Sequence, residues 1–328
     1  MFNALVLPAP NEPPAVRQMR LEELPDNPVR IAVHYSSVNY KDALAIGAAG
    51  RIIRGSFPFV PGIDLVGQVI ESDSDGFAPG DWVTQTGGGL GESTWGGLSQ
   101  RQHVTDQWLV SIPSNMTPLK SMIAGTAGLT AMYAVMALNK HGVEPGSGDV
   151  IVTGASGGVG SFAVALLAAL GYTVAASTGK TVAHEYLRKL GASRIVDRTV
   201  LSGGPARPLQ RSKWAGAVDT VGGQTLAAVV SSIRRHGSVA ACGNAGGARL
   251  ETSVFPFILR GVSLLGIDSN TAPVAQRREA WELLAATLAD EVWDQILSGI
   301  IPLAEVFSAC TRMLRGEVTG RIVVDVNG

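Results

Sequence analysis

The chain has 328 residues, of which 26 are Lys or Arg and 27 are Asp or Glu, so its formal net charge is −1. This balance argues against a nucleic-acid binder, which usually carries a basic surplus. The two cysteines, Cys242 and Cys310, are too few for a disulfide scaffold or a structural zinc site, and a reducing, cytoplasmic setting is expected. At about 100–200 residues per domain, the length predicts two domains.

The beginning of the chain and its apolar stretches give no sign of membrane targeting. Residues 1–8 lack the basic region and the long apolar region of a secretion signal. The apolar stretch at 162–170 is far shorter than the ~20 residues that span a bilayer. We therefore expect a soluble, cytoplasmic protein without a membrane partner.

The first 120 or so residues have the pattern of β-structure. Short Val- and Ile-rich runs, such as 30–35 and 65–70, are separated by Gly, Pro and Asp, and several of them alternate apolar and polar residues. Glycine-rich loops follow at 55–62 and 87–97. This region predicts an irregular barrel.

After Pro118 the pattern changes to alternating helices and strands. An apolar helix is expected over 121–138, and further helices over 158–170, 182–190 and 223–234. Between them lie short apolar runs, which predict strands at 150–153, 172–177, 194–197, 217–220 and 238–242. Continuous apolar strands between helices are typical of a doubly wound parallel sheet.

The remaining segments complete the expected domain organisation. Residues 198–213 predict a surface loop, 274–288 a helix, and 319–326 a strand that needs a sheet to join. The first region is the β-rich one, so the last strand is expected to return to it. We predict a β-rich domain of residues 1–122 and 270–328, with a Rossmann domain of residues 123–269 inserted into it.

A glycine-rich turn connects the first expected strand of the Rossmann domain to a helix. The turn runs over residues 153–160 and includes Ser156, Gly157, Gly158 and Val159. Glycine permits a tight turn, and it lets backbone N–H groups at the helix N-terminus approach a pyrophosphate. A tight turn without a ligand is the alternative, but strand, turn, helix and second strand follow in the order of a dinucleotide site.

The end of the second expected strand favours NADPH over NADH. A site for NAD usually places an acidic residue there to bind the ribose 2′-hydroxyl. This chain instead has Ser177, Thr178, Gly179 and Lys180, and Arg198 follows the third strand. A 2′-phosphate would be held by these cations and hydroxyls. The alternative is that Lys180 and Arg198 are ordinary surface cations.

Several motifs resemble the medium-chain dehydrogenase/reductase superfamily. They are ASGGVG at 155–160, VPGIDLVG at 60–67 and PGDWV at 79–83. Four others look like the zinc-free, quinone oxidoreductase-like branch, in its acryloyl-CoA reductase group: SVNYKDALA at 37–45, WAGAVDTVGG at 214–223, ACGNAGG at 241–247 and PFILRGV at 256–262. The resemblance covers the whole chain. It implies an α/β fold, with the Rossmann doubly wound parallel sheet inserted into a GroES-like, β-rich catalytic domain, usually as a homodimer.

The same resemblance argues against a catalytic zinc ion. Zinc alcohol dehydrogenases of the superfamily have Gly-His-Glu where this chain has Gly62, Ile63 and Asp64, and they have a cysteine where it has Asn39. Without those thiolate and imidazole groups a zinc ion lacks its three protein ligands. No metal is expected.

The resemblance implies reduction of the carbon–carbon double bond of acryloyl-CoA. Hydride goes to the β-carbon, negative charge builds on the thioester oxygen, and the α-carbon takes a proton. Tyr40 is predicted to contact the cofactor or to donate this proton, while Asn39 and Asp42 organise the same wall and Asp64 orients its neighbours. Packing for Tyr40 and helix capping for Asp42 are the alternatives.

The resemblance also adds residues around the cofactor and the substrate. Further cofactor contacts are expected at Asn244, Ile258, Ser269 and Arg321, with loop capping and core packing as alternatives. Cys242 is read as a buried apolar residue. Cations for the CoA phosphates could come from five arginines: Arg51, Arg54, Arg260, Arg277 and Arg278.

Three functions remain open from the sequence. The first is an NADPH-dependent acryloyl-CoA (2-enoyl-CoA) reductase with an acyl-CoA thioester as substrate. The second is a reductase of quinones or free enones. The third is an NADPH-binding protein without turnover, against which the Asn39–Asp42 segment argues, because a pure binder does not need it.

Overall fold

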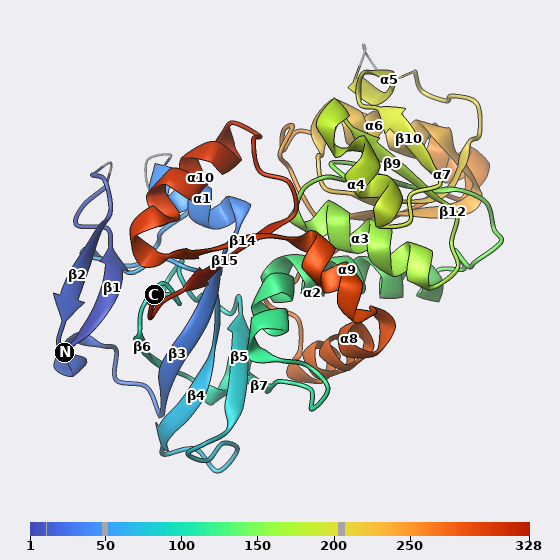
Figure 1. Cartoon of the computed structure of the whole chain (residues 1–328). Helices are drawn as coiled ribbons and strands as arrows, with labels where there is room; N and C mark the ends of the chain where they lie inside the picture. The colour runs from blue at the N-terminus through green and yellow to red at the C-terminus, as the bar shows by residue number, and fades with distance from the viewer. Residues whose placement is uncertain (11, 48–51, 203–206) are drawn as a thin grey trace. The chain divides into compact units, whose positions relative to one another are not determined.

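The computed structural model describes residues 1–10, 12–47, 52–202 and 207–328 (Figure 1). The chain divides into two compact units. Unit 1 consists of Met1–Thr126, Ser269–Ala285 and Leu297–Gly328, and unit 2 of Ala127–Asp268 and Ala286–Ile296. The helix α2 (Pro118–Lys140) runs from one unit into the other.

Unit 1 is built on a mostly antiparallel seven-stranded sheet. Its order is β14-β15-β3-β4-β5-β7, and β6 pairs with β3 off this path. The strands are β3 (Val29–Val38), β4 (Asp64–Ser72), β5 (Trp82–Thr86), β6 (Arg101–Val104), β7 (Val110–Ser111), β14 (Leu297–Pro302) and β15 (Arg321–Asp325). A separate hairpin-like pair joins β1 (Phe2–Val6) to β2 (Ala15–Met19).

The last strand returns to the first region, as the sequence predicts. β15 pairs antiparallel with β3, so that Ile322 lies opposite Val38. Along β3, Val29, Ile31 and Val33 are buried at alternate positions and belong to the core of this unit. The sheet is irregular, with two register shifts between β3 and β4. Gly67 lies at this crossing, where a Cβ would come within 2.3 Å of the Ala32 carbonyl oxygen.

The helices of unit 1 are short apart from α8. They are α1 (Tyr40–Gly47), α8 (Val274–Thr287) and α10 (Val306–Leu314), with 3-10 turns at Leu21–Glu23, Asp106–Trp108 and Leu303–Glu305. α1 and α10 pack against each other, and α10 also contacts β3. The sequence did not predict α10 or β14, and it indicated α1 only through the capping alternative for Asp42.

Unit 2 is a six-stranded, wholly parallel sheet in the order β10-β9-β8-β11-β12-β13. The strands are β8 (Val150–Val152), β9 (Val174–Thr178), β10 (Arg194–Asp197), β11 (Trp214–Asp219), β12 (Ile233–Ala241) and β13 (Ser263–Gly266). The central strands β8 and β11 are buried throughout, as expected of a sheet with both faces covered. This is the predicted doubly wound sheet.

Helices cover this sheet. α3 (Gly158–Ala169) packs against β8 and β9, and α6 (Gly223–Ser232) against β11 and β12. The other helices are α4 (His184–Lys189), α5 (Thr199–Ser202), α7 (Phe255–Arg260) and α9 (Asp290–Ile296), with a 3-10 turn at Thr181–Ala183.

Three features of unit 2 differ from the sequence prediction. The helix after β11 ends at Ser232, and Ile233 is already extended with ψ 142°, so β12 begins five residues before the expected strand. The expected loop over 198–213 contains α5, although residues 203–206 lie outside the described part of the chain. The strand β13 was missed.

One segment groups differently from the predicted domains. Residues Ala286–Ile296 belong to unit 2, whereas the sequence placed them in the first domain. The reason is packing, because Trp293 of α9 is 2% exposed and meets Phe162 of α3 edge-on, with ring centroids 5.7 Å apart.

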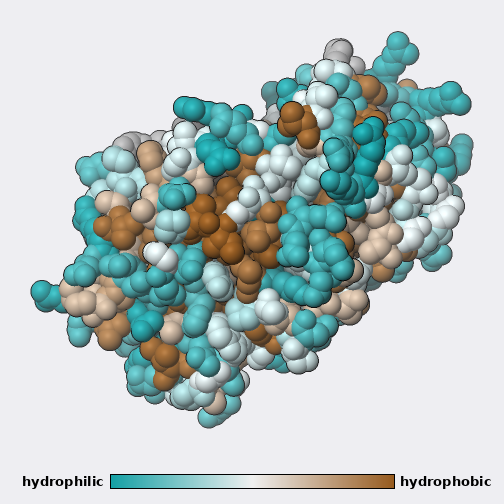
Figure 2. All heavy atoms as spheres, in the orientation of Figure 1, coloured by the Kyte–Doolittle hydropathy of each residue, from teal (hydrophilic) through white to brown (hydrophobic). Residues whose placement is uncertain are grey.

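The longest helix is apolar and internal. By length and composition alone α2 could cross a membrane, and 83% of its most apolar window is buried inside the structure. A core helix passes the same test, so this helix says little about membranes. Figure 2 shows hydrophilic residues over much of the face drawn, with apolar residues gathered in smaller groups among them.

Candidate active site

The glycine-rich turn of unit 2 has the predicted strand–turn–helix geometry. β8 leads into Gly154, whose φ is +56°, and α3 begins at Gly158 after the extended Gly157. At Gly160 a Cβ would lie 2.3 Å from the Gly154 carbonyl oxygen, so only glycine lets the turn close on the helix. The N–H groups of the first helical turn have no partner within a helix, and they favour anions.

A buried carboxylate that sequence reasoning missed holds this turn in place. Asp219, at the end of β11, is 0% exposed and accepts hydrogen bonds from Thr153 Oγ1 at 2.7 Å and from the Gly222 backbone N–H at 2.7 Å. Burial raises the pKa of Asp219 above its usual value. An acidic residue directly after a buried strand was the available signal.

The end of β9 gathers the predicted polar residues. Ser177 and Thr178 are buried, and Thr178 Oγ1 accepts from the Lys180 N–H at 3.1 Å and lies 3.2 Å from Ser156 Oγ. The Arg198 side chain lies across Gly179, where a Cβ would be 2.5 Å from Arg198 Nε. Burial lowers the pKa of the Lys180 ammonium group. Hydroxyls and two cations therefore surround this strand end.

The other predicted residues of unit 2 are near strand ends but are not joined by hydrogen bonds to the glycine-rich turn. Asn244 is exposed in the loop after β12, where its carbonyl accepts from the Gly247 N–H at 2.9 Å. Ile258 on α7 is 68% exposed, which argues against core packing. Cys242 donates to the Asp219 carbonyl at 3.3 Å, and burial raises its pKa to about 12, consistent with an unreactive thiol.

Unit 1 contains a buried polar cluster around Asp64. Asp64, the first residue of β4, is 0% exposed. Its Oδ2 accepts from Ser37 Oγ at 2.6 Å and from Asn39 Nδ2 at 2.8 Å, and its Oδ1 accepts from Thr126 Oγ1 at 2.5 Å. Arg321 lies 3.7 Å away as an ion-pair partner. The structure thus brings together Asn39 and Asp64, from the predicted catalytic group, and Arg321, from the predicted cofactor contacts.

Asp42 lies in the first turn of α1, beside this cluster. It is 1% exposed, and its two carboxylate oxygens accept the backbone N–H groups of Asn39 at 2.9 Å and Ile63 at 3.0 Å. Burial and the nearby charge of Asp64 raise the pKa of Asp42 to about 7. Asp42 therefore both caps the helix and organises the chain around Asn39.

Tyr40 is the accessible member of the predicted group. It begins α1 and is 41% exposed, while its neighbours Asn39 and Asp42 are buried. A phenol on such a position can donate a hydrogen bond or a proton to a bound molecule. The role predicted for it stays a prediction.

The expected phosphate-binding arginines divide clearly. Arg277 is 1% exposed, and its guanidinium donates to four backbone carbonyls, those of Thr86, Ser269, Asn270 and Ala272. A buried guanidinium engaged in this way is not available to a phosphate, so that expectation was wrong. The hydrogen bond to its carbonyl also places Ser269 in the segment 269–272, which Arg277 binds through its backbone.

Arg260 is partly buried, and its guanidinium is also engaged by backbone carbonyls. It donates to the carbonyls of Ser231 and Ile233, both at 3.0 Å, and to that of Gln210 at 2.5 Å. Arg278 is exposed, Arg54 is exposed beside Glu92, and Arg51 lies outside the described residues. Only side-chain environment, which sequence does not give, separates these five arginines.

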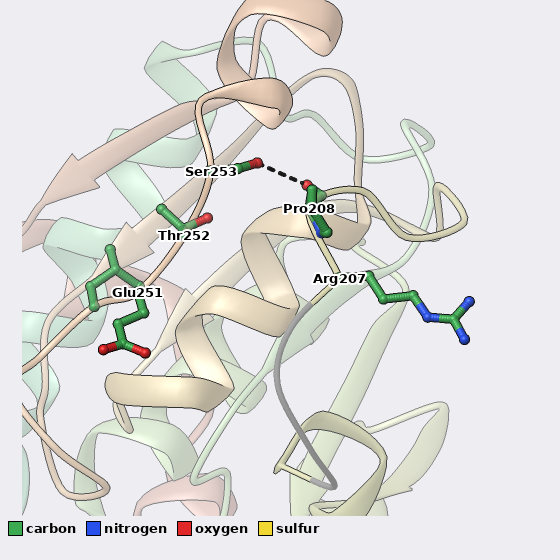
Figure 3. Close-up of a pocket in the computed structure, with 6 residues that line it drawn as sticks. Arg207, Pro208, Glu251, Thr252 and Ser253 are labelled. Atoms are coloured by element: carbon green, nitrogen blue, oxygen red, sulfur yellow. Dashed lines mark hydrogen bonds between the residues drawn. The ribbon is translucent and has the colours of Figure 1, made fainter.

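A surface hollow in unit 2 has a volume of about 410 Å³ (Figure 3). Its lining includes Arg207, Glu251 and Thr252, and Ser253 Oγ donates to the Pro208 carbonyl at 3.3 Å. In Figure 3 the Arg207 side chain points away from Glu251. The hollow contains none of the predicted site residues.

Comparisons with known proteins agree with this architecture. Residues 25–140 match the model of the alcohol dehydrogenase GroES-like domain, and residues 158–286 match that of the zinc-binding dehydrogenases. The acrylyl-CoA reductase AcuI of Ruegeria pomeroyi is 49% identical over 333 residues, which cover 100% of both chains. The chain belongs to the medium-chain dehydrogenase/reductase superfamily.

Within this superfamily the chain has further close relatives. The probable acrylyl-CoA reductase AcuI of Escherichia coli is 47% identical over 95% of both chains. The putative quinone oxidoreductase YhfP of Bacillus subtilis is 43% identical, covering 94% of this chain and 93% of YhfP.

Two solved structures of the superfamily match nearly the whole chain. E. coli YhdH with bound NADPH has a TM-score of 0.96 at 46% identity, covering 99% of this chain and 100% of that one. B. subtilis yhfP with NAD bound has a TM-score of 0.95 at 42% identity, covering 99% of both chains.

The residues that differ from those of the zinc enzymes belong to the polar cluster of unit 1. In the described ranges, no three His, Cys, Asp or Glu side chains gather into a group that could hold a metal ion. Asn39 and Asp64 stand at two positions where the zinc enzymes have other residues, and here their side chains hydrogen-bond to each other. The prediction that no metal takes part remains a prediction.

Proposed function

We propose that this protein reduces the carbon–carbon double bond of acryloyl-CoA to give propionyl-CoA, with NADPH as the reductant. In the balanced reaction, acryloyl-CoA, NADPH and a proton give propionyl-CoA and NADP⁺. The observation that carries the proposal is the full-length similarity to two acrylyl-CoA reductases. It is supported by a nucleotide-binding turn in unit 2 and by the Asn39–Asp42 segment in unit 1.

The residues at the end of β9 fit NADPH. Lys180 and Arg198 would hold the 2′-phosphate, together with the hydroxyls of Ser177 and Thr178. The strand ends in hydroxyls rather than in the carboxylate that binds a ribose 2′-hydroxyl. The first turn of α3 would hold the pyrophosphate.

The chemistry divides between the cofactor and the chain. When bound, NADPH supplies hydride to the β-carbon of the substrate. The chain must stabilise the charge on the thioester oxygen and deliver a proton to the α-carbon. Tyr40 suits this role because it is 41% exposed, whereas Asn39 and Asp42 are buried and the Asp42 carboxylate accepts the backbone N–H of Asn39.

A second candidate function is reduction of quinones or free enones. The similarity to YhfP favours this function. The structure of B. subtilis yhfP contains NAD, so the choice between NADPH and NADH must be tested together with the substrate. The two functions share the hydride chemistry and differ in whether the CoA moiety is needed. A nucleotide-binding protein without turnover is the third possibility.

A substrate panel tests the proposal. NADPH consumption would be followed with acryloyl-CoA, crotonyl-CoA, acrylate and a benzoquinone, and each reaction repeated with NADH. Fast turnover with NADPH and acryloyl-CoA, and not with acrylate, supports the reductase. Turnover with the quinone alone would replace it with the second function, and tight NADPH binding without turnover would leave the third.

We also propose that the protein is a cytoplasmic homodimer. The edge strand β13 ends the parallel sheet, and apolar side chains are exposed on it and on the preceding α7, namely Val254, Phe255, Ile258, Leu259 and Leu264. Exposed apolar groups of this kind often mark an interface. Light scattering should give twice the 34.1 kDa chain mass, and a monomer mass would contradict the proposal.

A further inference from the structure

A buried carboxylate in the glycine-rich loop 87–97 has no role in the chemistry proposed for Tyr40. Glu92 is 4% exposed. Its Oε1 accepts a hydrogen bond from Lys41 Nζ at 2.8 Å, and its Oε2 accepts one from Arg54 Nη2 at 3.4 Å. Both contacts are ion pairs. Because a buried charge needs a partner, Glu92 constrains where the Lys41 ammonium group can lie.

We infer that Glu92 is a positioning residue, which holds the first turn of α1 through Lys41 and so places the Tyr40 phenol for proton transfer. Lys41 directly follows Tyr40 in α1, so an ion pair on one residue fixes the backbone of the other. The inference rests on the proposed function, in which Tyr40 delivers the proton. It gives this buried charge an effect on kcat and none on cofactor affinity.

Glu92 also binds the chain beyond α1. Its backbone carbonyl accepts the N–H groups of Arg54 at 2.6 Å and of Gly55 at 3.2 Å. The same residue therefore contacts the first turn of α1 through its side chain, and the segment after α1 through both its side chain and its backbone. Support of this kind from surrounding residues is what keeps a catalytic group in its productive geometry.

The loop that carries Glu92 packs tightly on the segment before β4. Gly91 has φ +69°, and a Cβ there would lie 2.6 Å from the carbonyl carbon of Gly62. The next residue, Ile63, donates its N–H to the Asp42 carboxylate at 3.0 Å. The first turn of α1 is therefore attached to this region of the chain twice, directly through Asp42 and through the ion pair with Glu92.

Removing the charge of Glu92 while keeping its shape tests the inference. Glu92→Gln should lower kcat for acryloyl-CoA roughly tenfold, since a small misplacement of a catalytic group is enough for such a loss. The dissociation constant of NADPH, measured by its fluorescence, should stay within about twofold, because no binding interaction is removed. Glu71→Gln is the matched control, since the exposed Glu71 forms an ion pair with Arg30 at the same 2.8 Å distance in unit 1. The control should leave kcat unchanged.

The cation of the ion pair offers a rescue experiment. Lys41→Met removes the ammonium group and keeps a long side chain, so it should lower kcat about as much as Glu92→Gln. Lys41→Arg retains the positive charge and should recover most of this loss. If Lys41 and Glu92 served packing alone, the variants would lower the melting temperature and leave kcat unchanged, and that result would overturn the inference.

A double-mutant cycle tests whether Glu92 acts through Tyr40. In a Tyr40→Phe background the proposed proton donor is absent, so Glu92→Gln should lower kcat further by less than about twofold. An equal fold loss in both backgrounds would show that Glu92 acts on another group, against the inference. If Glu92→Gln does not fold, Lys41→Met takes its place in the cycle, because the Lys41 side chain is 37% exposed.

Hydrogen exchange adds a readout that does not need turnover. In α1 the Ala43 N–H donates to the Asn39 carbonyl at 3.0 Å. Exchange in the peptide that spans α1, followed by mass spectrometry, should become roughly fivefold faster in Glu92→Gln, because the ion pair no longer opposes local opening. Glu71→Gln should show the exchange of the unchanged protein. Unaltered exchange in Glu92→Gln would contradict the inference.

These experiments distinguish failure of the inference from failure of the proposed function. If the unchanged protein does not reduce acryloyl-CoA, the proposed function fails, while hydrogen exchange still tests the contact between Glu92 and α1. If it does reduce acryloyl-CoA and Glu92→Gln matches it in kcat, only the inference fails.

Discussion

Asn39 and Tyr40 are adjacent in the chain, but their side chains have opposite environments. Asn39 is 7% exposed and bound on both sides of its amide, whereas Tyr40 is 41% exposed. The difference arises because α1 begins at Tyr40, so the chain turns between them. A buried side chain held by hydrogen bonds, Asn39, is therefore followed directly in the chain by a side chain that a ligand can reach, Tyr40.

The role of Tyr40 can be tested by removing one oxygen atom. Tyr40→Phe should lower kcat for acryloyl-CoA by about 100-fold, the scale of general acid catalysis, because the ring remains and the donor is lost. Tyr35→Phe, on β3 of the same unit, is the matched control and should leave kcat unchanged. Equal kcat values for Tyr40→Phe and the unchanged protein would remove Tyr40 from the proton transfer.

We propose that the cofactor preference depends on two cations, Lys180 at the end of β9 and Arg198 after β10. Lys180→Ala and Arg198→Ala should each raise the KM for NADPH roughly tenfold, since a hydrogen bond to a charged group is worth about 1.5–3 kcal/mol. The KM for NADH should stay the same. Lys189→Ala, an exposed lysine on α4 paired with Glu185, is the control. An equal rise in the KM for NADPH and for NADH would show that Lys180 and Arg198 do not bind the 2′-phosphate.

At the scale of elements, α1 carries a carboxylate whose ionisation opposes folding. The pKa of Asp42 is raised from 3.8 to about 7 by burial and by Asp64. The group therefore contributes stability below pH 3.8 that is lost as the pH rises through about 7. The contribution of Asp42 to the unfolding free energy should therefore fall between about pH 4 and 7.

Asp42→Asn isolates this contribution. The variant should show a flatter dependence of the melting temperature on pH over that window, measured by calorimetry. Asp81→Asn, at an exposed carboxylate in a turn, should retain the slope of the unchanged protein. Identical slopes for Asp42→Asn and the unchanged protein would show that Asp42 ionises normally in the folded state.

The break in α2 depends on a single glycine. Gly125 has φ +48°, and a Cβ there would lie 2.3 Å from Asp64 Oδ2 and 2.8 Å from Arg321 Nη2. Gly125→Ala should lower the unfolding free energy by about 3 kcal/mol or more, because the backbone is strained and the buried side chains of Asp64 and Arg321 are displaced. Gly142→Ala tests the strain alone, because Gly142 has φ +79° with nothing within 4 Å of its Cβ. Equal losses of unfolding free energy in the two variants would contradict the contact of a Cβ at position 125 with Asp64 and Arg321.

Sequence pattern predicted most of unit 2 and less of unit 1. Buried parallel strands such as β8 and β11 are continuous apolar runs, which are recognisable without a structure. β13 and β14 were missed, because their burial alternates weakly and Leu264 and Ile300 are exposed. The start of α1 at Tyr40 was indicated only by the capping alternative for Asp42, whose carboxylate accepts the N–H groups of Asn39 and of the distant Ile63.

At the scale of the whole molecule, the predicted catalytic residues lie in unit 1, whereas the predicted cofactor residues divide between unit 2 and, for Tyr40, Ser269 and Arg321, unit 1. The glycine-rich turn was predicted well, because strand, turn and helix are consecutive in the chain. The cluster around Asp64 could not be, since Ser37, Asp64, Thr126 and Arg321 are up to 284 residues apart. For the same reason the sequence could not show that Arg277 donates to four backbone carbonyls, or that Asp219 hydrogen-bonds to Thr153 of the glycine-rich turn.

The central claim is that hydride passes from NADPH to the β-carbon of acryloyl-CoA. Its most direct test is to incubate the protein with acryloyl-CoA and NADPH deuterated at both C4 positions, and to analyse the product by mass spectrometry and NMR. The account predicts propionyl-CoA with a single deuterium at its β-carbon. Unlabelled propionyl-CoA, deuterium at the α-carbon, or no propionyl-CoA despite NADPH binding would contradict it.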